Sequence, residues 1–164
     1  MTTTEYPTPL NAEVSKRMRA NPRRDTKPER AFRSALHAHG LRFRKDHLVQ
    51  VTDLTVRPDV VFPRLRIACF VDGCYWHCCP EHGTRARHNA GYWSAKLARN
   101  VERDRRVSAR LRAAGWTVLR FWEHESPLDA AARVQAVVGR ERRTQVRTAR
   151  LPAQASRVAG GRRR

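Results

Sequence analysis

The sequence has no long apolar run and is poor in acidic residues. No stretch approaches the roughly 18 apolar residues of a membrane helix, and residues 1–10 lack the hydrophobic core of a signal peptide. We therefore expect a soluble, intracellular protein with no membrane partner. Only 15 Asp and Glu accompany 34 Lys and Arg, which gives a formal net charge of +19. This excess predicts a polyanion as partner, although charge alone does not separate DNA from RNA.

Cysteine is also scarce, and its distribution is uneven. The chain has four cysteines in 164 residues, and all of them fall between positions 69 and 79. In a reducing compartment such crowding favours metal binding over disulfide formation. The sequence therefore predicts a metal site.

The length suits one domain, because two halves would each bury too little surface. Residues 1–13 carry Pro and Thr without periodicity, and residues 140–164 contain nine Arg and two Gly. We expect a flexible N-terminus at 1–13, one folded domain at 14–139 and a disordered basic tail at 140–164. The tail is either an arm on nucleic acid or a solvated terminus; as an arm, it would add affinity and not chemistry.

Helix and strand signals alternate along the domain. Thr26 and Glu29 have the spacing of a capping box and Gly40 marks a stop, so we expect a helix from Lys27 to His39. The later elements should be strands at Leu41–Val49, Val56–Phe62 and Leu65–Asp72, a loop at 73–92, a helix at Trp93–Ala114, a strand at Trp116–Trp122 and a helix at Pro127–Val138. This order predicts an α/β fold with a mixed central sheet covered by helices.

Two acidic residues stand at the ends of predicted central strands. Asp59 follows Pro58 at the start of an apolar strand, and Asp72 ends the next strand. A Pro-Asp pair is common in turns and says little by itself. Two carboxylates at adjacent strand ends, however, match the geometry that holds a divalent metal against a phosphate.

The loop after Asp72 concentrates cysteine and histidine. Four residues can supply a tetrahedral, structural zinc site, the last of them from beyond the final strand: Cys74, Cys79, His82 and His124. The alternatives are Cys78 in place of Cys79, or a buried thiol cluster with a surface histidine. Cys69 is expected to be an ordinary core thiol.

Asp104 falls on the apolar face of the predicted helix at 93–114. It shares steps of four and three residues with Leu97, Val101, Ser108 and Leu111. A carboxylate that faces a core needs a partner, and a histidine whose other ring nitrogen must be basic is suitable. We expect His77, and a salt bridge to one of the arginines in residues 102–106 is the alternative.

Five motifs, in this order and spacing, resemble those of the very-short-patch-repair (Vsr) DNA endonucleases. They are Asp25–Glu29, Arg57–Asp59, Gly73–His77, Asn100–Asp104 and Trp122–Glu123, within a match over roughly residues 14–138. Each motif is weak alone, but their joint occurrence is specific. The resemblance implies a restriction-endonuclease-like fold of the PD-(D/E)xK type, with a mixed central sheet flanked by helices.

The resemblance also implies a reaction. Members of the family nick the strand that carries the mispaired thymine of a T:G mismatch, 5' to that thymine, and leave a 3'-hydroxyl and a 5'-phosphate. The mismatch arises when 5-methylcytosine deaminates. The implied cofactors are catalytic Mg²⁺ and structural Zn²⁺, and the implied partner is double-stranded DNA with the mismatch, at the nucleoid of a bacterial cytoplasm. Recruitment by mismatch-repair proteins stays open, and we expect a monomer.

The family's catalytic roles can be carried over to matching positions. Asp59 and the main-chain carbonyl of Val71 would hold Mg²⁺ against the scissile phosphate. His77 would act as general base on the attacking water, and Asp104 would orient and polarise it. Glu29 would support the water network at the metal, unless it only caps its helix.

The DNA-binding positions of the family fall on Tyr75, Trp76, Trp93 and Asn100. Aromatic rings wedged between base pairs unstack a duplex, and a mispair lowers the cost of doing so. For Trp93, at a helix start, a place in the core is the alternative. Trp116 and Trp122 are expected in the core.

The chain departs from the best-known branch of the family at Asp72, where that branch has a histidine. An acid cannot donate a proton as an imidazolium does, so we expect Asp72 to bind metal as a second strand-end carboxylate. The zinc ligands depart as well: Cys79 and His82 replace a histidine and a cysteine, and His124 replaces a cysteine.

Two other functions use part of the same pattern. A nuclease of the same fold that acts in restriction, or on other damaged or branched DNA, would need the same catalytic residues. A non-catalytic zinc module that binds nucleic acid would explain the charge and the Cys/His loop, but not Asp59, His77 and Asp104 together.

Overall fold

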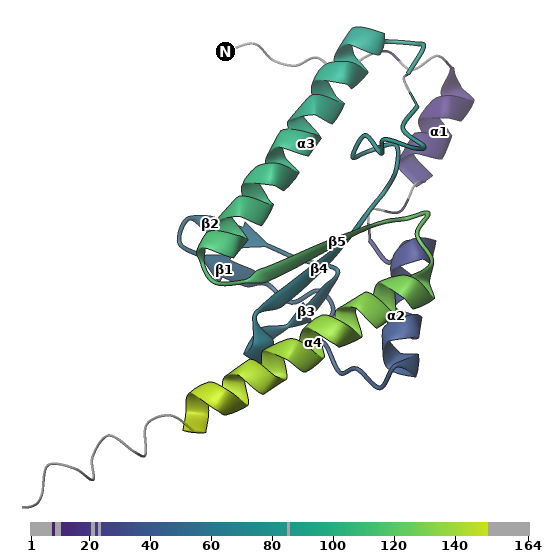
Figure 1. The fold of residues 1–164 in the computed structure, drawn as a ribbon. Coiled ribbons are helices and arrows are strands. Elements are labelled where there is room, and N and C mark those ends of the chain that lie inside the picture. The colour runs from purple at the N-terminus through teal and green to yellow at the C-terminus, as the bar shows by residue number, and fades with distance from the viewer. Residues whose placement is uncertain (1–7, 9–10, 21, 23, 85, 151–164) are drawn as a thin grey trace, which may run out of the picture.

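The computed structural model describes residues 8, 11–20, 22, 24–84 and 86–150. Its elements are α1 (Ala12–Ala20), α2 (Lys27–Ala38), β1 (Val49–Val51), β2 (Leu54–Val56), β3 (Val60–Phe62), the 3-10 turn η1 (Pro63–Leu65), β4 (Ile67–Asp72), α3 (Ala90–Ala113), β5 (Thr117–Trp122) and α4 (Pro127–Arg150). Figure 1 shows a small sheet with α2 and α4 on one side and α3 on the other. Within these residues, no helix is both long and apolar enough to cross a membrane.

Helix α2 begins where its sequence predicts. The side chain of Thr26 accepts a hydrogen bond from the Glu29 N–H, and Pro28 occupies the first turn. The cap satisfies a backbone donor that has no partner inside the helix, and proline lacks a donor that would be unpaired there. The chain leaves the helix through Gly40, whose φ of +69° suits glycine. The predicted helix is confirmed, and its start places Glu29 in the first turn.

The central sheet has three strands in the order β3-β4-β5. Strand β3 pairs antiparallel with β4, and β4 pairs parallel with β5, with Asp72 opposite Trp122. Strands β1 and β2 form a separate antiparallel hairpin. The predicted mixed sheet is confirmed. Parallel neighbours need a long crossover, and here it contains the Cys/His loop and α3, so β4 and β5 end at the same edge of the sheet.

The two faces of the sheet bury different cores. The face toward α2 and α4 carries Val60, Ile67, Cys69 and Phe121. The face toward α3 and the hairpin carries Val61, Ala68 and Val118. Successive strand residues point to opposite faces, which explains the alternation. Cys69 is fully buried in the first core, as predicted.

The predicted inward stripe of α3 is also confirmed. Leu97, Ser108 and Leu111 are buried, and Val101 and Asp104 are half-buried. Asp104 therefore lies on the side of α3 that faces the sheet.

Two predicted strands are wrong in their extent. In Leu41–Val49, Arg44 forms an isolated bridge to Val61, the chain then turns at Asp46 with a φ of 52°, and only Val49 belongs to a strand, as the first residue of β1. Leu41 and Phe43 both face the core, which gives an irregular segment the period of a strand.

The predicted strand Val56–Phe62 is divided into β2 and β3. Pro58 is buried at the break, and it has no N–H to donate to a strand ladder. Asp59 consequently lies between two strands, not within one.

The ends of the folded region also differ from the prediction. Helix α4 continues to Arg150, so residues 140–150 of the predicted disordered tail are helical, while residues 151–164 lie outside the described residues. Helix α1 was not predicted, and residues 12 and 13 of the predicted flexible N-terminus belong to it. Helix α3 begins at Ala90, earlier than predicted.

Candidate active site and metal centre

A cleft of about 1990 Å³ opens at the C-terminal end of β4. Its walls come from α1, α2, β2, the loop after β4 and α3. The predicted catalytic residues all line it: Glu29, Asp59, Asp72, His77 and Asp104. The fold therefore brings together carboxylates and an imidazole that are far apart in the sequence.

Asp59 lies in the break before β3, against the backbone of β4. Its Oδ2 accepts a hydrogen bond of 2.7 Å from the Val71 N–H. Burial, with repulsion from Glu29 and Asp72, raises the pKa of Asp59 from 3.8 to about 6 despite this hydrogen bond. A cation beside the carboxylate would offset both effects, so the position suits a metal.

His77 and Asp104 form a close pair. His77 Nδ1 lies 2.5 Å from Asp104 Oδ2. Burial alone raises the pKa of Asp104, but the hydrogen bond and charge of His77, with the charge of Arg120, hold it below its usual value. The predicted contact is confirmed. The alternative partner is present too, since Arg103 Nη2 is 3.4 Å from Asp104 Oδ1.

The structure gives Asp72 a partner that the sequence analysis did not expect. Arg120 Nε and Nη2 each donate a hydrogen bond of 2.6 Å to one of the two carboxylate oxygens of Asp72. Asp72 is buried, and His77 Nδ1 is 3.7 Å from its Oδ1. This bidentate ion pair occupies the carboxylate that was expected to bind metal. The sequence signal for this ion pair was the position of Arg120 inside the apolar strand β5.

Glu29 lies both in the cap of α2 and in the wall of the cleft. Thr26 Oγ1 donates a hydrogen bond of 2.8 Å to Glu29 Oε1, within the cap of α2. Arg33 Nη1 lies 3.6 Å from Oε2, and Arg33 also pairs with Asp25. Glu29 is thus held by the helix start while it lines the cleft.

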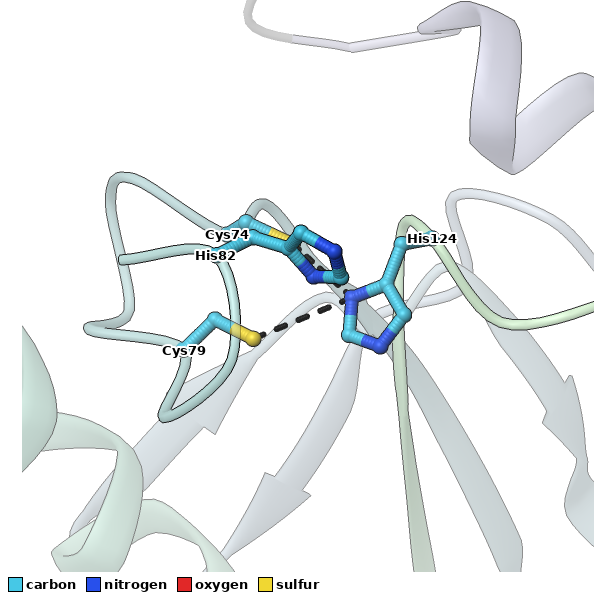
Figure 2. Close-up of side chains that lie close together, drawn as sticks. All are labelled: Cys74, Cys79, His82 and His124. Atoms are coloured by element: carbon cyan, nitrogen blue, oxygen red, sulfur yellow. Dashed lines mark hydrogen bonds between the residues drawn. The ribbon is translucent and has the colours of Figure 1, made fainter. Parts of the chain in front are cut away.

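A second cluster lies where the loop after β4 meets the end of β5. Its ligand atoms all lie within 4.8 Å of one another, and they belong to Cys74, Cys79, His82 and His124. Figure 2 shows the four side chains directed toward one another, with His124 on the segment that follows β5 and the other three on the loop after β4. Cys78 is exposed and outside the cluster, so the choice of Cys79 over Cys78 agrees with the geometry.

Short turns of the loop create this arrangement. Cys79 N–H donates to the Cys74 carbonyl at 2.9 Å, and Gly83 N–H donates to the Cys79 carbonyl at 2.8 Å. A Cβ at Gly83 would lie 2.4 Å from that carbonyl oxygen, so the turn requires glycine. Cys74 and Cys79 therefore face the same side of the loop.

The cluster has the chemistry of a cation site. Burial, Cys79 and Glu123 raise the pKa of Cys74 to about 11, so a nearby cation is needed to stabilise its thiolate. His124 Nδ1 lies 3.1 Å from Cys74 Sγ, and His124 Nε2 lies 3.5 Å from Glu81 Oε2. A carboxylate on the second nitrogen is typical of metal-binding histidines.

Aromatic side chains gather at the outer end of the cleft. The ring centroids of Trp76 are 5.1 Å from Tyr75 and 6.0 Å from Trp93. Asn100 Nδ2 donates a hydrogen bond of 3.1 Å to the Trp76 carbonyl. The four predicted DNA-binding residues therefore form one group. Lys96, which was not predicted, adds a positive charge 5.1 Å from the Trp93 centroid.

The sequence also matches known proteins. Residues 10–81 match the family model described as DNA mismatch endonuclease Vsr. The chain is 55% identical over 130 residues to the type II nicking enzyme V.NaeI of Lentzea aerocolonigenes, which covers 79% of this chain and 78% of that protein. It is 42% identical over 114 residues to the DNA mismatch endonuclease Vsr of Escherichia coli strain K12, with 68% and 70% covered. For the type II nicking enzyme V.XorIIP of Xanthomonas oryzae pv. oryzae, identity is 42% over 106 residues, with 62% and 73% covered.

Proposed function

Because this chain belongs to the Vsr family of DNA mismatch endonucleases, we propose that it nicks one strand of double-stranded DNA at a T:G mismatch. Membership in the family makes it a DNA endonuclease. The observation that carries the proposal is the cleft that is lined both by Asp59 and by the paired side chains of His77 and Asp104. The nick would lie 5' to the mispaired thymine and begin repair of deaminated 5-methylcytosine. We extend the proposal to a restriction-endonuclease-like fold for the sheet and its helices.

Asp59 and the main-chain carbonyl of Val71 would hold Mg²⁺, with Glu29 supporting the surrounding water. Mg²⁺ supplies positive charge to the scissile phosphate as negative charge develops on it. The raised pKa of Asp59 supports this assignment, because it results from burial and from nearby negative charge that a cation would offset. Asp72 is not part of the proposal, because both its oxygens accept hydrogen bonds from Arg120.

His77 would accept a proton from the attacking water at Nε2. The pKa of Asp104 is lowered, so its carboxylate is ionised and can only accept a hydrogen bond. His77 Nδ1 must then carry the hydrogen in their contact, which leaves the lone pair on Nε2. When the ring becomes an imidazolium, Asp104 stabilises its new charge.

The aromatic group at the end of the cleft would open the duplex at the mispair. Trp76 and Trp93 line the cleft, and Tyr75 packs against both. A T:G pair is easier to unstack than a matched pair, so such a wedge favours the mismatch without reading many base edges. Asn100 would hold the wedge in place through its hydrogen bond to Trp76.

Zn²⁺ would bind at Cys74, Cys79, His82 and His124. Two thiols and two imidazoles at these separations match a tetrahedral site in which the protein fills every position, so the role is structural. The site would fasten the loop that carries His77 to the end of β5.

A nicking assay tests the proposed reaction. Two duplexes that differ only in a central T:G or C:G pair are incubated with the full chain, in Mg²⁺ and in EDTA. We expect a nick in the thymine strand of the T:G duplex, and only with Mg²⁺. Asp59→Asn and His77→Ala should each lower the rate by about 100-fold or more. Asp53→Asn is the matched control, because Asp53 is 63% exposed and pairs with Arg110.

Each other outcome selects a different function. Equal cleavage of both duplexes would indicate a nuclease of the same family directed at another DNA structure or sequence. Full activity of Asp59→Asn would refute the role of that carboxylate. DNA binding without cleavage under any of these conditions would favour the non-catalytic zinc module.

A further inference from the structure

We propose that Arg120, anchored by Asp72, is a positioning residue that fixes the His77–Asp104 pair for proton transfer. The proposal rests on the proposed function, because it concerns the same proton acceptor. It gives a role to the buried Asp72 and the half-buried Arg120, which the reaction above does not use.

Arg120 is tied to the pair by a chain of polar contacts. Its Nη2 donates a hydrogen bond of 2.6 Å to Asp72 Oδ1, and it lies 3.4 Å from Asp104 Oδ1. The other oxygen of Asp104 contacts His77 Nδ1. Arg120 and His77 therefore each engage a different oxygen of the same carboxylate, so rotation of that carboxylate would break both contacts.

The guanidinium is itself held on several sides. Asp72 accepts hydrogen bonds from Nε and Nη2 of Arg120. Nη1 lies 3.4 Å from the hydroxyl oxygen of Ser108 on α3. The Phe70 ring lies beneath it, 4.8 Å from its central carbon. A planar, bidentate ion pair stacked on a ring has one orientation, which lysine does not reproduce. Asp72 thus serves to orient Arg120.

The charges explain why the arrangement needs both residues. Asp72 and Asp104 both lie within 3.7 Å of His77 Nδ1, so without a cation two carboxylates would compete for one N–H. Arg120 neutralises Asp72 and directs the imidazole toward Asp104. A hydrogen bond from His77 Nδ1 to Asp72 would rotate the imidazole and direct Nε2 away from the attacking water.

A second cavity also borders this network, and it shares Asp72, His77, Asp104 and Arg120 with the cleft. It has a volume of about 510 Å³, and its lining also includes Arg105, Ser108 and Arg112. A small cation in solution can therefore approach the place of the Arg120 side chain through this cavity.

Arg120→Ala with chemical rescue tests the proposal. At saturating enzyme, the single-turnover nicking rate should fall by about 100-fold while the Kd for the mismatched duplex changes little. Millimolar guanidinium chloride should restore part of the rate, and the same concentration of sodium chloride should not. Arg120→Lys should keep the charge but recover less than guanidinium does. Arg112→Ala, an exposed arginine of the same cavity, should behave as the wild type with and without guanidinium.

A second readout does not depend on activity. The two nitrogen resonances of His77, assigned by comparison with His77→Ala, report which nitrogen carries the hydrogen. We expect the Nδ1–H form in the wild type and a mixture in Arg120→Ala. If Arg120→Ala does not fold, Asp72→Asn and Arg120→Lys replace it, with the same expected directions.

The results separate this proposal from the proposed function. If the wild type does not nick, the proposed function fails, while the His77 resonances still decide the role of Arg120. If the wild type nicks and the Arg120 and Asp72 variants keep its rate and its His77 resonances, the positioning role is wrong. A lower rate without guanidinium rescue, and with an unchanged Nδ1–H form, would also overturn it.

Discussion

Asp59 illustrates how a functional residue can work against the stability of its own fold. Its carboxyl is half-buried near Glu29 and Asp72, and these surroundings raise its pKa to about 6. A carboxyl with a higher pKa in the folded chain than in the unfolded chain binds more protons when folded. The free energy of unfolding therefore falls as the pH rises from about 4 to about 6.

Asp59→Asn should consequently stabilise the metal-free protein. At pH 7 in EDTA we expect a gain in the free energy of unfolding of up to roughly 3 kcal/mol, since an amide keeps the acceptor for Val71 N–H and has no charge to desolvate. Near pH 4.5 the gain should shrink, because Asp59 is then mostly protonated. Thermal or urea unfolding at both pH values measures it. An equal difference in the free energy of unfolding between Asp59→Asn and the wild type at both pH values would contradict the raised pKa of Asp59.

Two neighbouring cysteines provide a matched test of the zinc site. Cys79→Ser should abolish stoichiometric zinc binding and lower the free energy of unfolding by several kcal/mol, because Cys79 belongs to the four-residue cluster. Cys78→Ser should change neither, because Cys78 is exposed and outside the cluster. Atomic absorption of the purified variants and their melting curves measure both effects. Equal zinc content in the two variants would exclude the proposed ligand set.

At the residue scale, the sequence identified side chains whose need for a partner was visible in a local pattern. Asp104 was found because helical spacing places it beside Ser108 and Leu111, and the zinc ligands because three of them share one loop. Arg120 was missed. Its face of β5 depends on the register with β4, and its partner Asp72 is 48 positions away, which no local pattern encodes.

At the scale of elements, prediction succeeded where the ends of an element carry their own signals. Helix α2 has a capping threonine and a terminal glycine, and β4 and β5 are apolar runs with clear limits. The β2–β3 boundary was missed because Pro58 interrupts an otherwise continuous strand pattern. Helix α1 was missed because nine residues are too few for a helical period to stand out in the sequence.

The distal part of α4 was predicted to be disordered because it is rich in arginine and poor in apolar residues. Arginine favours helices, and the segment continues an established helix instead of starting a new one. Gln145 also donates a hydrogen bond of 2.8 Å to the Arg64 carbonyl, which fastens this part of α4 to η1.

This basic helix end should strengthen DNA binding without affecting the chemical step. Residues 140–150 contain five arginines and one glutamate. Compared with a chain that ends at Arg150, a chain that ends at Gly139 should bind duplex DNA about tenfold more weakly at moderate salt, with a shallower salt dependence. The single-turnover rate at saturating enzyme should stay within about twofold. Fluorescence anisotropy at several salt concentrations gives the affinities.

Gln145→Ala is the control for lost packing, because it removes the contact with Arg64 and keeps every arginine. It should bind DNA as the longer chain does. If both truncated chains have the same affinity and salt dependence, the arginines at the end of α4 do not contact DNA.

At the scale of the whole molecule, the order of elements was enough to predict a mixed sheet flanked by helices. The sequence could not show which strands are parallel. That pairing follows from the crossover through α3, whose Val107 and Leu111 pack on the sheet face with Val118. The cleft is a product of this topology, since β4 ends beside the start of the loop and the middle of α3.

Neither hydrophobic core contains a residue from the loop at 73–89. A newly made chain could therefore form its sheet and both cores before the proposed zinc site is filled. Until the proposed zinc site that joins Cys74 to His124 forms, the imidazole of His77, which would accept the proton of the attacking water, would lack its fixed position. The supply of zinc would then limit how many molecules of the proposed endonuclease are active.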